Sequence, residues 1–126
     1  MNNPIVGKSF SFAVKIVNLS RSIRNRKEYE LARQLLRCGT SIGANVAEAQ
    51  KAQSERDFLA KIYIAYKEAG ETEYWIRLLH TTGIVSDSEY QDIIKDVQEL
   101  LKILSSITKS MEEKLGDIVK QLWFAA

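Results

Sequence analysis

Apolar residues recur every three or four positions along four segments of the chain, the spacing of one face of an α-helix. The four stripes comprise Phe12, Ile16, Leu19 and Ile23; Leu35, Cys38, Ile42 and Val46; Phe58, Ile62, Ala65, Ala69, Ile76 and Leu79; and Ile93, Val97, Leu100 and Leu104. In the first segment Phe10 and Val14 widen the stripe, which favours a packed core over a two-stranded seam. The pattern predicts helices at about 7–24, 28–51, 54–82 and 87–112.

Helix starts and stops agree with this division. Polar pairs at capping-box or N-cap spacing are Asn25 with Glu28, Ser54 with Asp57, and Ser86 with Glu89. Gly83 is the expected C′ residue of the third helix. Short connections leave sequential helices antiparallel, so the sequence predicts an all-α, antiparallel, up-and-down four-helix bundle. The stretch 113–126 stays open, because Gly116 interrupts a segment that is otherwise too apolar for a solvated end.

Length and composition place the chain among small soluble proteins. Its 126 residues fit one domain, 1–126, and the apolar and charged fractions of 45% and 27% are those of a globular protein. Cys38 is the only cysteine, so no internal disulfide can form. We find neither a secretory signal nor an apolar run long enough to span a membrane. We therefore expect a cytoplasmic protein that does not enter a membrane.

Small and polar residues share the second predicted helix. Gly39 and Gly43 stand four apart, and each costs about 1 kcal/mol of helix stability relative to alanine. Close approach of another backbone would offset that cost. A polar stripe runs beside the glycines through Arg37, Ser41, Asn45 and Glu48, which predicts a hydrogen-bonded contact between helices.

The residues give little support to catalysis or metal binding. A di-iron carboxylate site in a bundle needs two Glu-x-x-His pairs, and this chain has one histidine, His80, near a helix end. Glu48 and Glu71 could act in acid–base chemistry only inside a cleft that shifts their pKa values. We favour structural pairing for both carboxylates, and expect no catalytic residue, metal or cofactor.

Basic charge is concentrated near the N-terminus. Residues 1–40 carry eight Lys or Arg against Glu28 and Glu30, although the whole chain has a net charge of only +2. Four of the eight fall within seven positions at a predicted turn: Arg21, Arg24, Arg26 and Lys27. The cluster is either a solvated turn or a contact for the phosphates of RNA. Only Tyr29 stands nearby as an aromatic residue on which a base could stack.

Two motifs resemble a known bacterial family. The stretch QLLRCGTSIGANVAEAQKAQSE over 34–55 is similar to the hallmark of the 23S rRNA intervening-sequence proteins; the matching positions include Arg37, Ser41, Asn45 and Glu48, with Cys38 and Ala49 where the family usually has Ser and Gly. A second block places Glu71, Trp75 and Leu79 at characteristic positions. The resemblance covers about residues 5–112. This resemblance implies a four-helix bundle that forms ring-like homopentamers. More distantly, the chain resembles accessory proteins of diversity-generating retroelements, which bind nucleic acid and a reverse transcriptase.

Self-association is also expected from the residues. Several large apolar side chains lie off the main stripes, among them Tyr63, Tyr66, Tyr74, Trp75, Leu78, Ile103 and Leu122–Phe124. They exceed what one stripe per helix can deliver to a single interior, and a monomer rarely exposes so large a patch. The leading interpretation is a non-enzymatic, self-associating bundle, a homo-oligomeric ring, with RNA or another protein as its candidate partner. The alternatives are an RNA-binding accessory protein, or an enzyme that uses Glu48 or Glu71.

Overall fold

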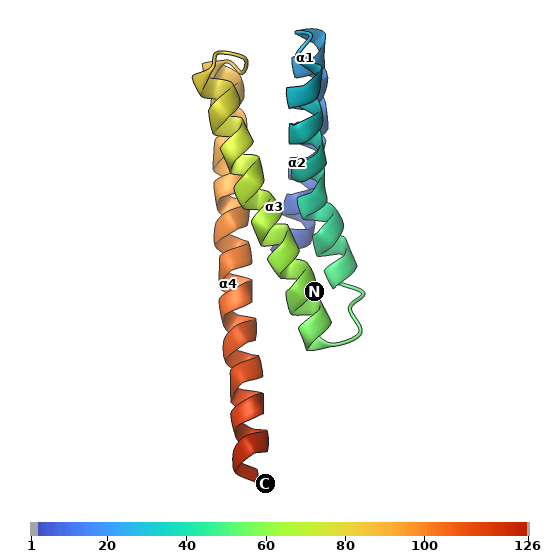
Figure 1. The fold of residues 1–126 in the computed structure, drawn as a ribbon, viewed down its shortest axis with the longest axis vertical. Coiled ribbons are helices and arrows are strands. Elements are labelled where there is room, and N and C mark those ends of the chain that lie inside the picture. Colours follow the sequence, from blue (N-terminus) through green and yellow to red (C-terminus); the bar gives the residue numbers. More distant parts are fainter. Residues whose placement is uncertain (1–2, 126) are drawn as a thin grey trace.

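The computed structural model describes residues 3–125, and for 118–120 and 122–125 it describes the backbone alone. Over that range the chain is all-α. It forms four helices, α1 (Pro4–Asn25), α2 (Tyr29–Ala49), α3 (Glu55–Thr81) and α4 (Asp87–Ala125), and no strand occurs among the described residues. The helices run up and down alongside one another (Figure 1). The predicted all-α four-helix bundle is confirmed.

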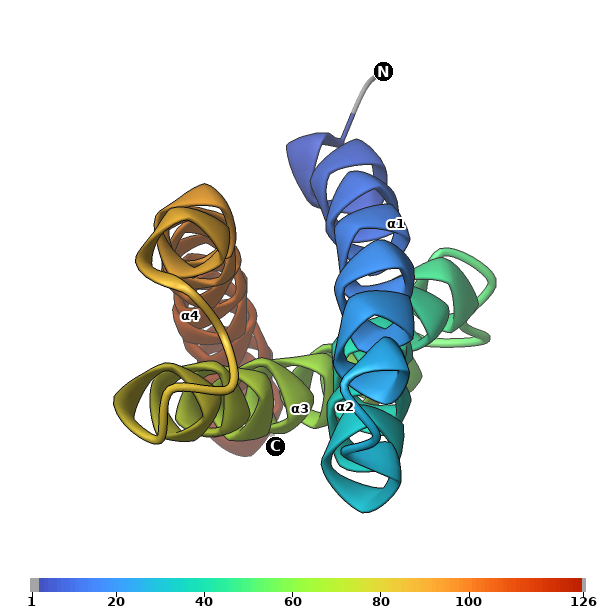
Figure 2. The same ribbon diagram turned by 90° about the horizontal axis from the view of Figure 1, so that it is seen from above.

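Each helix packs against the next along the chain, and α4 returns to α1. This last contact is the least extensive of the four, and Figure 2 shows α4 standing to the side of α1 while α1 lies over α2. Ion pairs span the α1–α4 seam: Lys8 to Glu99 at 3.0 Å, and Lys15 to Asp96 at 2.8 Å and Asp92 at 3.3 Å. Hydrogen bonds to the two aspartates raise the pKa of Lys15 above its ordinary value.

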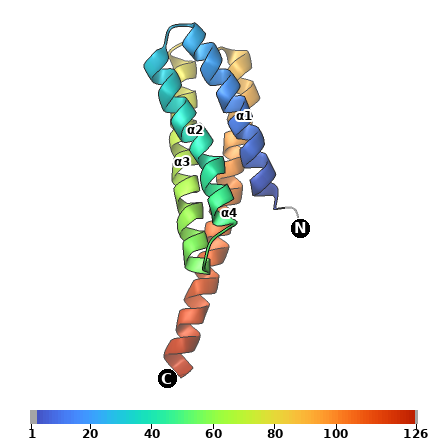
Figure 3. The ribbon, with the colours of Figure 1, turned by 90° about the vertical axis from the view of Figure 1, so that its right-hand side faces the viewer.

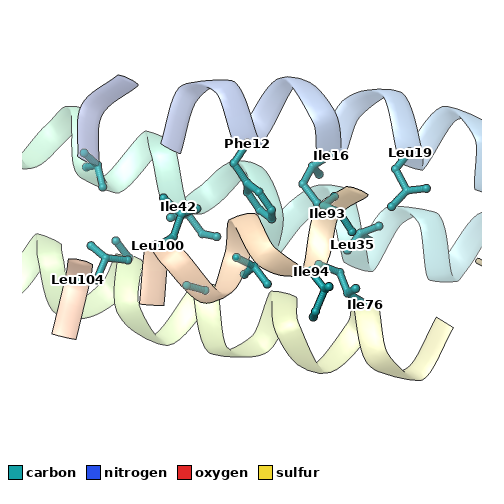
Figure 4. Packing of buried hydrophobic residues seen from close by; sticks show 14 of the residues in the cluster. Phe12, Ile16, Leu19, Leu35, Ile42, Ile76, Ile93, Ile94, Leu100 and Leu104 are labelled. Carbon is teal, nitrogen blue, oxygen red and sulfur yellow. The ribbon is translucent and has the colours of Figure 1, made fainter. Parts of the chain in front are cut away.

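The interior is formed by the predicted stripes. Phe12 and Ile16 of α1, Leu35 and Ile42 of α2, Ile76 of α3, and Ile93, Leu100 and Leu104 of α4 point into one shared core (Figure 4). The expectation that Phe10 and Val14 widen the core is wrong, because their side chains are 71% and 48% exposed. They lie on a flank of α1 that the described residues leave uncovered. Phe58, the first residue of the third predicted stripe, is only partly buried against the core.

Close approach of helices α1 and α2 accounts for the glycine pair. A Cβ built on Gly39 would meet the side chain of Ile16, and one built on Gly43 would lie 3.2 Å from the backbone oxygen of Ser9. The predicted backbone approach at these glycines is confirmed, and the neighbouring helix is α1.

The first connection differs from the predicted capping box. Asn25 is the last residue of α1, and Glu28 precedes α2 without making a side-chain cap. The turn is instead a Schellman motif, in which the amides of Lys27 and Glu28 bond the carbonyls of Arg24 and Ile23 at 2.8 and 3.4 Å. Lys27 adopts the left-handed conformation, with φ 66°, that usually selects glycine. The sequence pattern failed here because this stop depends on backbone bonds rather than on a signature residue.

The other helix boundaries follow their sequence signals. Ser54 Oγ accepts a hydrogen bond from the amide of Asp57 at 3.0 Å. Ser86 and Glu89 form a reciprocal capping box, with bonds of 3.1 and 2.9 Å. Gly83, at φ 80°, ends α3 in a second Schellman turn. These three predicted signals are confirmed.

Helix α4 is much longer than predicted. Lys114 pairs with Glu55, the first residue of α3, so the two helices are level at that point. Beyond it α4 continues to Ala125 and projects past the rest of the bundle (Figures 1 and 3). The predicted end at about 112 is therefore wrong, since Gly116 does not break the helix. Within the described part of the chain, no helix combines the length and apolarity that crossing a membrane requires.

Candidate functional site

Three of the predicted phosphate-binding cations meet at the α1–α2 turn. Arg21, Arg24 and Lys27 line an open hollow of about 460 Å³ together with Asn25 and Tyr29, which we call the basic hollow. Arg21 and Arg24 lie three residues apart on one side of α1. The Schellman turn then brings Lys27 and Tyr29, the first residue of α2, back beside them.

Ion pairing within the chain engages the other basic residues of the N-terminal third. Lys8, Lys15 and Arg26 pair with carboxylates of α4, Arg33 pairs with Glu30 of its own helix, and Arg37 pairs with Glu68 and Glu71 of α3. Among the described residues, no such pair involves Arg21, Arg24 or Lys27. The excess positive charge seen in the sequence is thus concentrated at the basic hollow.

Arg26 lies apart from these three cations. Its guanidinium bonds Glu89 of α4 at 2.6 Å and also donates to the carbonyl of Ile84 in the α3–α4 connection. The hydrogen bond from Arg26 lowers the pKa of Glu89 and raises that of Arg26. Arg26 therefore ties the α1–α2 turn to the neighbouring turn at the same end of the bundle.

A second hollow adjoins the basic one between α1 and α2. It measures about 290 Å³ and is lined by Ser20, Arg24, Tyr29, Ala32, Arg33 and Leu36; we call it the apolar hollow. The two hollows share Arg24 and Tyr29. Sequence reasoning missed the apolar hollow. The available signal is the spacing of Tyr29, Ala32, Arg33 and Leu36, which places all four on one side of α2.

The remaining motif residues lie along the seam between α2 and α3. Arg37 pairs with Glu71, whose carboxylate also accepts a 3.2 Å hydrogen bond from the indole of Trp75. The predicted contact between helices differs for Asn45, which donates to the hydroxyl and the carbonyl of Ser41 within α2, at 3.1 and 2.9 Å. At the other end, Glu48 approaches Lys61 of α3 at 3.7 Å, and its side chain is 64% exposed.

The two glutamates of this seam pair helices α2 and α3. Glu71 and Glu48 each face a cation at the surface, and neither belongs to the lining of the basic hollow or the apolar hollow. His80 bonds Asp87 at 2.6 Å and stacks on Tyr90 with ring centroids 3.9 Å apart, which joins α3 to α4. No group of His, Cys, Asp or Glu side chains in the described part of the chain is arranged to hold a metal ion.

Comparison with known proteins agrees with the helical motifs. The sequence pattern of the 23S rRNA-intervening sequence proteins matches residues 1–106, which includes α1, α2, α3 and the first half of α4. The chain belongs to the 23S rRNA-intervening sequence protein family. A search of curated proteins found no match. The family match ends within α4, so the projecting part of that helix lies outside it.

A solved structure supports the family assignment. The fold is similar to the crystal structure of a protein of unknown function from the S23 ribosomal protein family of Bacteroides thetaiotaomicron, with a TM-score of 0.81 and 49% sequence identity. The alignment covers 83% of this chain and 98% of the Bacteroides chain.

Proposed function

We propose that the protein is a non-enzymatic, self-associating helical bundle that acts as a homo-oligomer in the cytoplasm. The observation that carries the proposal is the uncovered flank of α1. Phe10 is 71% exposed, and Val6 and Val14, one turn to either side, are 38% and 48% exposed. An apolar strip of this kind on a folded domain is typical of an interaction site.

Other surfaces add to this support. Tyr63, Tyr66 and Tyr74 of α3 are 38%, 37% and 59% exposed, as expected for surplus apolar surface. The same expectation is wrong for Trp75 and Ile103, which are partly buried against the core. The side chains of Leu122–Phe124 lie outside the described residues. In a closed ring every subunit can bury its apolar flank against a neighbour, so no flank is left exposed. Five subunits is the number that the family resemblance implies.

The non-enzymatic part of the proposal rests on how the carboxylates are used. Glu71 is engaged by Arg37 and Trp75, and Glu48 is largely solvated. Neither carboxylate is the buried, unpaired group that acid–base catalysis in a cleft requires.

The self-association proposal is tested by light scattering coupled to gel filtration. We expect a mass that is a multiple of the 14.3 kDa chain mass, five times for the ring. Phe10→Asp should lower that mass, whereas Ser11→Asp, at the adjacent exposed position of α1, should leave it unchanged. A native mass equal to one chain at micromolar concentration would refute self-association, and a dimer would refute only the ring of five.

A second candidate function is RNA binding at the basic hollow, with Arg21, Arg24 and Lys27 as phosphate contacts. The specific support is that these three cations converge while the other basic residues of the N-terminal third are paired within the chain. Arg26, held by Glu89, lies outside this proposed contact. The hollow occupies the turn end of α1, away from Phe10, so RNA binding and self-association are compatible.

RNA binding of this kind is electrostatic and must weaken with salt. Reversing the three cations of the basic hollow to glutamate should abolish binding of a labelled RNA measured by fluorescence anisotropy. The matched control reverses three exposed lysines elsewhere, Lys51, Lys67 and Lys102, which changes the net charge equally. If both triple variants lose binding alike, the effect is one of net charge and the basic hollow is not the site.

A further inference from the structure

The basic hollow and the apolar hollow are neighbours that differ in chemistry. Arg24 and Tyr29 stand in the wall of both. On one side lie the charges of Arg21 and Lys27, and on the other the apolar surfaces of Ala32 and Leu36. A ligand that fills both must therefore join an anionic group directly to a flat, weakly polar body.

We propose that this site binds one unpaired nucleotide of single-stranded RNA, with the base in the apolar hollow and its phosphate in the basic hollow. The inference rests on the RNA-binding candidate and specifies which form of RNA is bound. It goes beyond phosphate contact, because it assigns to Tyr29, Arg24 and Leu36 a role in holding the base.

Tyr29 has the properties of a stacking platform. Tyr29 is the first residue of α2 and is 60% exposed. No aromatic side chain among the described residues stacks on its ring. Bases stack on such rings and on the plane of an arginine guanidinium, and Arg24 supplies the latter in the same wall. The volume of the apolar hollow, about 290 Å³, suits a small aromatic group and is at the lower end of ordinary ligand sites.

The same geometry selects against double-stranded RNA. In an A-form duplex the bases are paired and stacked inside the helix, so none can enter a hollow without being flipped out. A duplex would therefore engage the cations of the basic hollow alone. An unpaired nucleotide reaches both hollows. Because a duplex also differs from a single strand in charge density, the contribution of the base is measured by comparing the strand that carries bases with the abasic strand.

The test uses the full-length protein and three labelled RNA probes: a short single-stranded oligoadenylate, the same strand in a duplex with oligouridylate, and the same strand with abasic positions. Binding is measured by fluorescence anisotropy at low salt. The variants are Tyr29→Ala, Tyr29→Phe, which keeps the ring, and Gln91→Ala. Gln91 is the surface control, because it is an uncharged, exposed residue of α4 that lines neither hollow and belongs to none of the apolar surfaces above. Gel filtration of every variant checks that its oligomeric state is unchanged.

We expect the single strand to bind most tightly and Tyr29→Ala to weaken it by about tenfold, the range of a lost base–aromatic stack. Tyr29→Phe and Gln91→Ala should bind as the native protein does. The abasic strand should bind native protein and Tyr29→Ala equally, since no base remains to stack. If Tyr29→Ala binds the single strand normally, or the duplex binds as tightly, the inference is overturned while RNA binding stands. If none of the probes binds, the RNA-binding candidate falls and the inference with it.

Discussion

A Cβ atom at Gly39 of α2 would lie 2.7 Å from the branched carbons of Ile16 on α1. Ile16 is fully buried in the core cluster, so a shift of its side chain would displace the residues packed around it. The absence of a side chain at Gly39 thus sets how closely α1 and α2 approach. This pair, rather than glycine flexibility, explains why a residue with poor helix propensity occupies the middle of α2.

Gly39→Ala should destabilise the fold although alanine favours helix. Overpacking of a filled core typically costs about 1–3 kcal/mol. The matched control is Gly70→Ala in α3, where a Cβ would meet nothing within 4 Å and only the propensity gain of about 1 kcal/mol remains. Urea unfolding at one fixed protein concentration should therefore show Gly39→Ala less stable, and Gly70→Ala more stable, than the native chain. Equal stability of the two variants would contradict the packing interpretation.

The two motif glutamates should differ in their effect on stability. Glu71→Ala removes the acceptor of both Arg37 and the Trp75 indole, and we expect a loss of about 1 kcal/mol because the pair is partly solvated. Glu48→Ala should change the free energy of unfolding by less than about 0.5 kcal/mol, since Glu48 is exposed and its pairing distance is long. Thermal unfolding followed by tryptophan fluorescence compares them. A larger loss for Glu48→Ala would show that its role is not the surface pairing seen here.

The Arg26–Glu89 pair predicts an acid-dependent loss of stability. Because Arg26 lowers the pKa of Glu89 in the folded state, the pair stabilises the protein above the ordinary value of 4.5, and this contribution disappears as pH falls through the lower folded-state pKa. Glu89→Gln keeps the oxygen that caps α4 but removes the charge. It should lower stability at neutral pH, and the difference from the native chain should shrink below pH 4.5.

The control for this pH dependence is Glu112→Gln. Glu112 is an exposed carboxylate of the same helix, and the described residues give it no ion pair. Melting temperatures across the acidic range should be nearly the same for this variant and the native protein. A difference between Glu89→Gln and native protein that stays constant with pH would exclude the ion pair as its source.

Cys38 should be unreactive while the protein is folded. Its thiol is buried, and burial raises its pKa, so little thiolate is present at neutral pH. A chromogenic disulfide reagent should label Cys38 only slowly in buffer and rapidly in denaturant. Fast labelling of folded protein would mean that α2 opens locally where it faces the core.

Prediction from sequence worked best where a feature depends on residues that are close together along the chain. Phe12, Leu35 and Val97 are buried as their helical spacing predicts. An apolar stripe along one side of a helix is removed from water only when that side faces the core. The reciprocal hydrogen bonds of Ser86 and Glu89 join residues three apart, so the spacing in the sequence was sufficient to predict this helix start. Phe10 was misplaced because it stands two residues from Phe12, about 200° around the helix, and so belongs with Val14 on the face opposite the core stripe.

The sequence by itself determined the all-α class, the antiparallel order and the family, since these depend on local periodicity and motif residues. Tertiary structure decided how the charges are distributed. It paired Arg26 with Glu89 and left Arg21, Arg24 and Lys27 around one hollow with Tyr29. In the sequence these cations form a single cluster. Neighbouring residues on a helix and its turn point in different directions, so the groups that each cation meets depend on the packing of distant helices.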